Sequence, residues 1–148
     1  MTTHRRHMLR ALEIARLQLH RTGKNPSVGC VIIDRDTQRL SEAATGDGGR
    51  PHAEQLALSR IPVGSAAGGT AYVTLEPCRE RSTEEAACSQ RLIEAGIAKV
   101  VIATRDPHPQ GNGGIERMKA AGLQVEIGLL KDEADQLYAD FFASIEQE

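Results

Sequence analysis

Apolar residues recur along this chain with two spacings, and each spacing predicts a different element. Steps of three and four residues near the start predict an amphipathic helix with one buried face. That face would carry Met8, Leu12, Ala15 and Leu19. Continuous apolar runs rich in β-branched residues predict buried strands at residues 27–33 and 69–75.

Turn signals connect these predicted elements. The polar segment 34–39 reverses the chain, so a weaker strand over residues 40–44 would pair with strand 27–33 as a hairpin. Glycines and a proline then mark residues 45–51 as a loop, which leads to His52. The stretch that follows has the composition of a helix.

After Cys88 the chain shows the same pattern twice, a helix that stops on a glycine and then a strand. Gly96 ends the first helix and Gly122 the second, at the position that glycine favours. Such units imply parallel strands joined by right-handed crossovers. A final helical segment would close the layer with one apolar face, formed by Ala134, Leu137, Phe141 and Ile145. We therefore predict an α/β fold, a three-layer α/β/α sandwich.

Length and composition narrow the possible functions. The 148 residues suffice for one compact domain and are too few for two, so we expect one domain over 1–148. Lysine and arginine number 18 against 20 acidic residues, and a formal charge of −2 offers no basic surface to a nucleic acid. Without tryptophan, and with two tyrosines and two phenylalanines, the chain also lacks platforms for stacking successive bases. These features favour a small ligand.

The basic N-terminus does not have the form of a signal peptide, because charged residues interrupt its apolar positions. A mitochondrial presequence is the alternative to a packed helix there. No window approaches the roughly 20 apolar residues that span a bilayer, so we expect no membrane contact and a cytoplasmic protein. The three cysteines are an odd number and favour reduced thiols over a disulfide framework.

Three residues near predicted element ends could form a catalytic zinc site. Such a site uses three nitrogen or sulfur ligands and leaves one position for water, and His52, Cys78 and Cys88 could supply the ligands. Taken singly, His52 could be a surface histidine and each cysteine a small buried apolar residue. Cys30 keeps that structural interpretation, because it lies in the middle of a predicted strand.

The presence of Glu54 favours a catalytic zinc site over a structural one. It follows His52 by two residues, at the start of the same predicted helix, so its carboxylate could reach a water molecule on the metal without binding the metal. That is the place of a proton shuttle. A His-x-Glu followed later by Pro-Cys and a second cysteine is the signature of zinc deaminases that act on cytosine-like or adenine-like rings.

The chain also resembles a known family over most of its length. From about residue 8 to residue 142 it resembles the deaminase domain of the riboflavin-biosynthesis diaminohydroxyphosphoribosylaminopyrimidine deaminases. The stretches that carry this resemblance are NPSVGCVI, GGRPHAEQLAL, GTAYVTLEPC, CSQRLIEAGIAKVVIATRDPHP and GNGGIERMKAAGLQVEIG. The resemblance implies a cytidine deaminase-like fold with a mixed five-stranded sheet, zinc bound by His52, Cys78 and Cys88, and Glu54 as the proton shuttle.

Three features of this sequence depart from that family. The segment between the two cysteines is RERSTEEAA, where the family has a loop with a glycine, two prolines and a basic residue that meets a substrate phosphate. Arg81, or else Arg79, could take that basic role. Thr45 replaces a histidine that many members have seven residues before the metal histidine, and we expect Thr45 to contact the substrate in its place; His108 replaces an asparagine. The reductase domain that follows in the family is not expected here.

The resemblance also implies contacts to the substrate. The backbone of Ala53 and of residues 75–77 would meet the ring edge, and Asn25 is the best candidate for a side-chain contact, although it could simply be a turn residue before a proline. Asp106 and His108 could contact the ligand or belong to a loop held by two prolines. Glycines at 111, 113 and 114 could admit a phosphate at a helix N-terminus.

We therefore expect a zinc-dependent deaminase of a small aminated heterocycle, a riboflavin-pathway aminopyrimidine or a related compound. The protein would be a homo-oligomer, with a separate reductase as a further partner. Two alternatives stay open. One is a deaminase of nucleobases, nucleosides or tRNA, which would show RNA binding with a steep salt dependence. The other is a non-catalytic zinc-stabilised partner of a reductase, which the presence of Glu54 disfavours.

Overall fold

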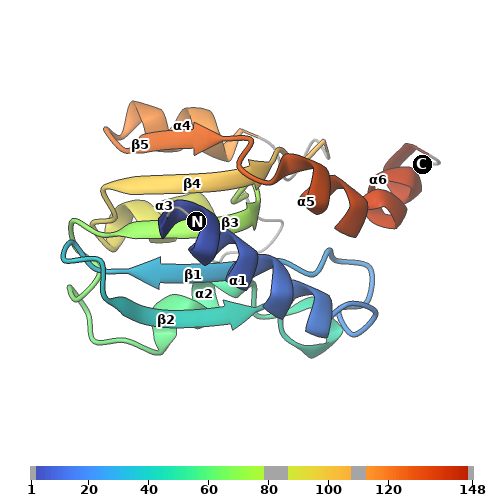
Figure 1. Ribbon diagram of the computed structural model, residues 1–148, viewed down its shortest axis with the longest axis horizontal. Coiled ribbons are helices and arrows are strands. Elements are labelled where there is room, and N and C mark those ends of the chain that lie inside the picture. Colours follow the sequence, from blue (N-terminus) through green and yellow to red (C-terminus); the bar gives the residue numbers. More distant parts are fainter. Residues whose placement is uncertain (1–2, 79–86, 108–112, 147–148) are drawn as a thin grey trace.

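A mixed sheet of five strands forms the middle layer of the protein (Figure 1). The computed structural model describes residues 3–78, 87–107 and 113–146. The strands are β1 (Gly29–Ile33), β2 (Arg39–Ala44), β3 (Thr70–Leu75), β4 (Lys99–Thr104) and β5 (Gln124–Ile127). They lie side by side in the order β2-β1-β3-β4-β5.

The strand directions confirm both predicted connections. β1 pairs antiparallel with β2, as a hairpin, and also antiparallel with β3. β3, β4 and β5 run parallel to one another, as the repeated helix-then-strand pattern predicts. Because parallel strands point the same way, the residues that follow β3 and β4 emerge on the same side of the sheet, at the carboxyl ends of these strands.

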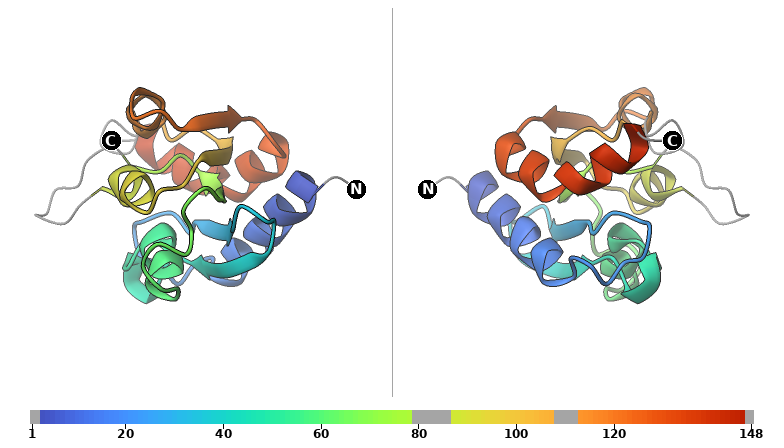
Figure 2. Two further views of the ribbon diagram at one scale, coloured as in Figure 1. Left: turned by 90° about the vertical axis from the view of Figure 1, so that its left-hand side faces the viewer. Right: turned by 90° about the vertical axis from the view of Figure 1, so that its right-hand side faces the viewer.

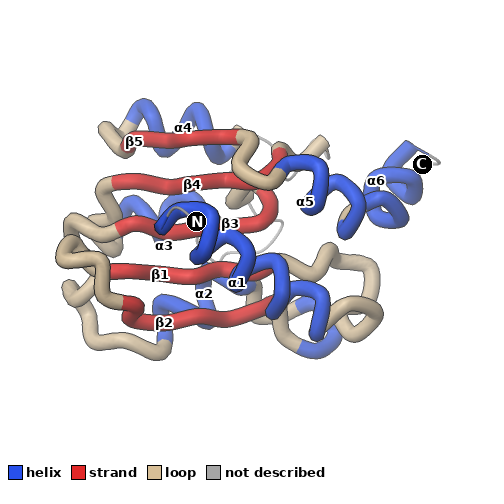
Figure 3. Tube along the Cα trace, viewed as in Figure 1, coloured by secondary structure: helices blue, strands red, loops and turns tan. Residues whose placement is uncertain are grey.

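Helices cover both faces of the sheet, which confirms the three-layer α/β/α architecture (Figure 2). They are α1 (Thr3–Leu17), α2 (Ala53–Ser59), α3 (Cys88–Glu94), α4 (Gly114–Ala120), α5 (Lys131–Leu137) and α6 (Ala139–Glu146). The core between α2, α3, α4 and the sheet is separate from the core that α1 and α5 form on the opposite face. In Figure 3, α1 crosses in front of the strands, and α5 lies to their right.

Alternation along β1 shows why the central strands are apolar throughout. Cys30 and Ile32 belong to the core under α2, α3 and α4, whereas Val31 and Ile33 belong to the core under α1 and α5. All five residues of β1 are buried. A strand that is covered on both faces needs apolar side chains at every position, so its sequence is a continuous apolar run.

The first helix is shorter than predicted. Met8, Leu12 and Ala15 are fully buried, as expected for its apolar face. Leu19 is wrong as a member of that face, since α1 ends at Leu17 and Leu19 is 37% exposed. The helical spacing no longer holds there, because the chain turns after Leu17 and reaches a positive φ of 71° at His20.

The C-terminal segment is also not a single helix. α5 ends at Leu137 and α6 begins at Ala139, with Tyr138 between them at φ −98° and ψ 7°. Ala134 is buried, and Leu137 and Phe141 pack against the core as predicted. Tyr138, which the apolar pattern did not include, is buried at this break.

Tyr138 ties the C-terminal helices to the first and third strands. Its hydroxyl donates a hydrogen bond to the carbonyl oxygen of Ser27, at 2.7 Å, and lies 2.6 Å from Thr74 Oγ1. Since the phenol has only one proton, Thr74 donates to Tyr138 and accepts from the amide of Gly29, at 3.0 Å. Burial raises the pKa of Tyr138, and the charges of Glu54 and Asp106 raise it further.

Tyr138→Phe is expected to lower the free energy of unfolding by about 1 to 3 kcal/mol, because it leaves two buried polar groups without these partners. Urea unfolding followed by circular dichroism measures the change. Tyr72→Phe is the matched control: Tyr72 is also buried, but within the described part of the chain its hydroxyl bonds to the partly exposed His4, at 2.5 Å. Equal losses in the two variants would contradict the role given to the Tyr138 network.

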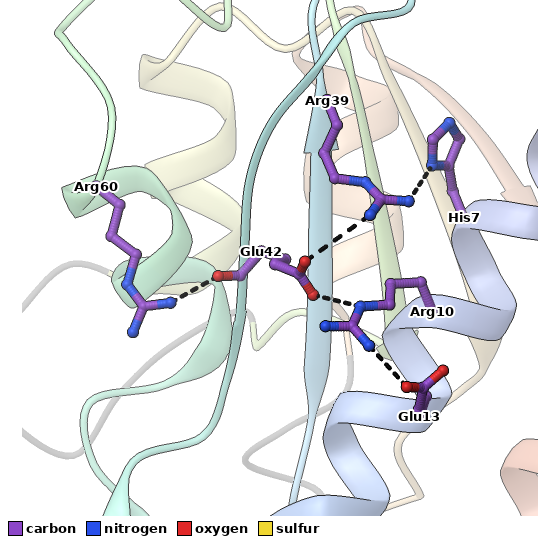
Figure 4. Close-up of polar contacts among 6 residues, drawn as sticks. All are labelled: His7, Arg10, Glu13, Arg39, Glu42 and Arg60. Carbon is purple, nitrogen blue, oxygen red and sulfur yellow. Dashed lines mark hydrogen bonds and ion pairs between the residues drawn. The ribbon is translucent and has the colours of Figure 1, made fainter.

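Charged residues cover the free edge of the sheet at β2 (Figure 4). The carboxylate of Glu42 pairs with Arg10 of α1 at 2.7 Å and with Arg39 at 3.8 Å, and its backbone carbonyl accepts from Arg60, beyond α2, at 2.7 Å. Arg39 also contacts His7, at 3.5 Å. Burial and the nearby charge of Arg39 lower the pKa of His7. Such charges disfavour pairing of this edge with a strand of another chain.

Among the helices that the structure describes, none is long and apolar enough to cross a membrane.

Candidate metal centre and catalytic site

Three segments that are far apart in the sequence meet beyond the end of β3. His52 is the N-cap residue of α2, and Cys88 is the first residue of α3. Cys78 follows β3 by three residues. The structure therefore brings the three predicted metal ligands together, at the edge of the sheet where ligands bind in many open α/β folds.

The distances within this group fit a zinc ion. The ligand atoms of His52, Cys78 and Cys88 all lie within 4.8 Å of one another, and His52 Nδ1 lies 3.3 Å from Cys88 Sγ. In a tetrahedral zinc site with usual bond lengths, neighbouring nitrogen and sulfur ligands are about 3.3 to 3.8 Å apart. One histidine and two cysteines are also donors that zinc prefers, with a fourth position left open.

Hydrogen bonds prepare Cys78 for metal binding. Its thiol interacts with Cys88 and His52, and these contacts lower the pKa of Cys78 against the opposing effect of burial. The amide of Cys88 donates to Cys78 Sγ at 3.2 Å, and the amide of Ser89 donates to the Cys78 carbonyl at 3.1 Å. The thiolate is the form of cysteine that binds metals, so these contacts favour the form that binds.

Cys30 lies outside this group, as predicted. It is fully buried in β1, and burial raises its pKa well above the usual range, with a smaller contribution from the charge of Glu54. A thiol that stays protonated in an apolar core is a poor metal ligand. Among the described residues, only one group of metal-binding side chains is close enough to hold an ion, and it excludes Cys30.

Glu54 is the second residue of α2 and is 3% exposed. It is not part of the group of candidate ligands. Its charge acts on Cys30 in β1 and on Tyr138 beyond the sheet, which places the carboxylate inside the fold. A buried carboxylate two residues from a proposed metal ligand is shielded from bulk solvent, and its role as a proton shuttle stays a prediction.

The remaining residues predicted to contact the substrate are only partly described. Ala53 is buried as the first residue of α2. Asn25 Nδ2 donates to the carbonyl of Gly49 at 3.0 Å, which joins its loop to the loop that leads to His52. Thr45 is buried, and its hydroxyl accepts from the amide of Val28 at 2.9 Å. Both side chains thus make structural hydrogen bonds, and their substrate contacts stay predictions.

Asp106 is nearly buried and follows β4. It therefore lies at the carboxyl ends of the parallel strands, as does Cys78, which follows the neighbouring strand β3. Arg81 and His108 lie outside the described residues, as do the rest of the segment 79–86 and residues 109–112. Their predicted substrate contacts are untested.

Sequence reasoning missed the side chain of Glu76, which precedes Pro77 and Cys78. The family resemblance implies a role only for the backbone of Glu76, yet its side chain is fully buried. Its carboxylate accepts hydrogen bonds from the amides of Asp106, Gly113 and Ile115. The available signal was a carboxylate at the end of a buried strand, because a charged residue in that place needs partners.

This chain is similar to known deaminases and riboflavin biosynthesis proteins. The family model of the cytidine and deoxycytidylate deaminase zinc-binding region matches residues 1–104, which contain His52, Glu54, Cys78 and Cys88. The riboflavin biosynthesis protein RibD of Escherichia coli (strain K12) is 43% identical over 136 residues, which cover 91% of this chain and 36% of that protein. The chain therefore spans little more than a third of that relative.

A second relative has nearly the length of this chain. The diaminohydroxyphosphoribosylamino-pyrimidine deaminase of Buchnera aphidicola subsp. Acyrthosiphon pisum is 42% identical over 138 residues, which cover 92% of this chain and 91% of that protein. Among solved structures, the diaminohydroxyphosphoribosylaminopyrimidine deaminase/5-amino-6-(5-phosphoribosylamino)uracil reductase of Thermotoga maritima superposes with a TM-score of 0.90 at 33% identity. That similarity covers 98% of this chain and 42% of the other.

Proposed function

This chain belongs to the riboflavin-pathway branch of the cytidine and deoxycytidylate deaminase zinc-binding family, and from that membership we propose that it is a zinc-dependent deaminase of a riboflavin-pathway aminopyrimidine. The observation that carries the proposal is the convergence of His52, Cys78 and Cys88, together with a buried carboxylate, Glu54, two residues after His52. A structural zinc site would need the three ligands and a fourth, but it would not need Glu54.

The proposed reaction replaces the amino group of the ring by an oxygen from water and releases ammonia. Zinc held by His52, Cys78 and Cys88 would lower the pKa of a water molecule to about 7. Glu54 accepts a proton from this water and passes it to a ring nitrogen, so that the oxygen can bond to the carbon that bears the amine. Glu54 then delivers the second proton of the water to the departing amine, which leaves as ammonia.

The substrate is proposed from the relatives. The Buchnera protein, of nearly the same length, is named as a deaminase of diaminohydroxyphosphoribosylamino-pyrimidine. Since the E. coli and Thermotoga relatives are more than twice as long, and the name of the Thermotoga protein includes a reductase, we also propose that a reductase consumes the product of this chain. The homo-oligomer predicted from the sequence stays a prediction.

Ammonia release from zinc-loaded protein tests the proposed function. Diaminohydroxyphosphoribosylaminopyrimidine should be deaminated with a kcat/KM well above that for cytidine, dCMP or adenosine in tRNA. Faster deamination of one of those three would place the chain elsewhere among the deaminases. Zinc-loaded protein that released no ammonia from any of them would fit the non-catalytic alternative.

Arg81 is expected to recognise the substrate phosphate, because the segment that carries it is attached at both ends to the proposed ligands Cys78 and Cys88. Arg81→Ala should raise KM for the phosphorylated pyrimidine by about ten- to 150-fold, the equivalent of a charge-assisted hydrogen bond of about 1.5 to 3 kcal/mol. Zinc content should not change. Arg79→Ala is the matched control.

Steady-state kinetics on the phosphorylated and dephosphorylated pyrimidines separates phosphate recognition from ring recognition. For wild-type protein kcat/KM should be higher with the phosphate, and Arg81→Ala should remove this difference. Equal values on wild type would show that the chain does not recognise the phosphate. A larger effect of Arg79→Ala would transfer the contact to Arg79.

A further inference from the structure

Glu76 is a buried carboxylate that the proposed chemistry does not use. Its side chain has no exposed surface, although it stands only two residues before the proposed ligand Cys78. The amide of Glu76 donates to the Thr104 carbonyl at 3.0 Å, so its backbone is joined to the end of β4. A buried charge is costly unless hydrogen bonds or opposite charges compensate for it, and the partners of Glu76 therefore indicate what it holds.

Those partners belong to the two described ends of the loop between β4 and α4. Glu76 Oε1 accepts from the amide of Asp106 at 3.2 Å. Glu76 Oε2 accepts from the amides of Gly113 at 3.0 Å and Ile115 at 3.2 Å. Arg105 adds an ion pair, with its Nε 3.6 Å from Oε1. One carboxylate thus binds both ends of the loop at once.

The start of α4 depends on this carboxylate. The first amides of a helix have no partner within the helix, and the N-cap residue of α4 is Gly113, which has no side chain to offer. Glu76 takes the place of an N-cap side chain from a different part of the sequence. The backbone of α4 also touches the same segment directly, since a Cβ added at Gly114 would lie 1.8 Å from the Pro77 carbonyl oxygen.

Both oxygens of Glu76 face N–H donors, and this arrangement requires a carboxylate. A glutamine would have the same shape but would turn an NH₂ group toward the amide of Asp106 or toward those of Gly113 and Ile115. Two donors would then face each other in a buried place. An aspartate would keep both accepting oxygens but would be shorter by one methylene group.

We propose that Glu76 is a positioning residue for substrate binding, which holds Asp106 and the first turn of α4 in place against the segment that carries Cys78. This inference rests on the proposed function and on the prediction from the family resemblance that Asp106 contacts the substrate. Glu76 acts through backbone amides and makes no contact with the reacting atoms. Arg105 contributes less, because its side chain is half exposed and is shared with Glu116.

Glu76→Gln tests the proposal, with Glu116→Gln as the matched control. Both variants remove one carboxylate that pairs with Arg105, but Glu116 is exposed and is not bonded to these three amides. Zinc-loaded Glu76→Gln should show a KM for the aminopyrimidine raised by about tenfold or more, with a smaller change in kcat, because the binding groups are displaced. Zinc content should stay at the wild-type level, and Glu116→Gln should behave as wild type.

Glu76→Asp should give a KM between those of wild type and Glu76→Gln. If Glu76→Gln does not fold, Glu76→Asp serves as the test in its place. Hydrogen exchange measured by NMR on the zinc-loaded protein supplies a readout that needs no activity. The amides of Asp106, Gly113 and Ile115 should exchange faster in the Glu76 variants than in wild type or Glu116→Gln.

Lower stability with an unchanged KM in both Glu76 variants would overturn the proposal, and so would loss of zinc, which would mean that Glu76 acts on Cys78. Wild-type exchange rates at the three amides would overturn it as well. If the proposed function is wrong, wild-type protein would bind zinc and release no ammonia. The exchange rates of the Asp106, Gly113 and Ile115 amides would still report whether Glu76 holds these residues in place.

Discussion

Glu54→Gln is expected to abolish most of the deaminase activity while the fold and the metal stay in place. Glutamine has nearly the same shape as glutamate, and Glu54 is not among the residues that could hold the ion. The glutamine side chain cannot accept the proton of the water, and so it cannot return that proton to the ring and the amine. The rate should therefore fall by at least about a hundredfold, the lower end of the contribution of a general acid-base group.

Ammonia release at saturating substrate measures the effect, and metal analysis of the same sample measures zinc. Glu94→Gln is the matched control, because it makes the same chemical change at an exposed position of α3, the helix that begins with Cys88. Wild-type turnover in Glu54→Gln would remove Glu54 from the mechanism. Loss of zinc in that variant would show that Glu54 binds the metal.

Cys88→Ala is expected to lose the zinc and much of the stability of the zinc-loaded protein. Cys88 would supply one of the three ligand atoms, and its amide also donates to Cys78 Sγ. A ligand that binds only the folded state stabilises it, by about 4 kcal/mol when it is present at a thousand times its dissociation constant. The melting temperature of Cys88→Ala should therefore not respond to zinc, whereas that of wild type should rise.

Cys30→Ala is the matched control for this prediction, since Cys30 is a buried cysteine outside the metal group. It should keep about one zinc per chain and lose only the stability that follows from a small cavity in the core, because truncating a buried side chain removes packing contacts. Retention of zinc in Cys88→Ala would mean that the third ligand has been assigned to the wrong residue.

Local patterns were sufficient to predict most of the architecture. The apolar run of β1 indicates a strand covered on both faces, because alternate residues of the strand point into two different cores. Gly96 and Gly122 mark helix ends by their positive φ angles of 80° and 97°. These features depend on a few neighbouring residues, and a sequence displays such information directly.

The candidate ligands could be predicted for a related reason. Zinc is bound by few side-chain types, among them histidine and cysteine, and the spacing of His52 and Glu54 indicates which carboxylate could serve a metal-bound water. The sequence does not by itself bring Cys78 and Cys88 to His52. The parallel sheet does so, because it places the end of β3 beside the first turns of α2 and α3.

Only the tertiary structure decided the roles of Leu19, Glu76 and Tyr138. Leu19 matched the helical spacing, but the chain had already turned away from the core. Tyr138 lies between α5 and α6, and its buried hydroxyl bonds to Ser27. Glu76 is buried, and the amides that bond to it lie beyond β4. Hydrogen bonds between residues that are distant in sequence leave no periodic trace, so these positions became interpretable only once the strands and helices were packed together.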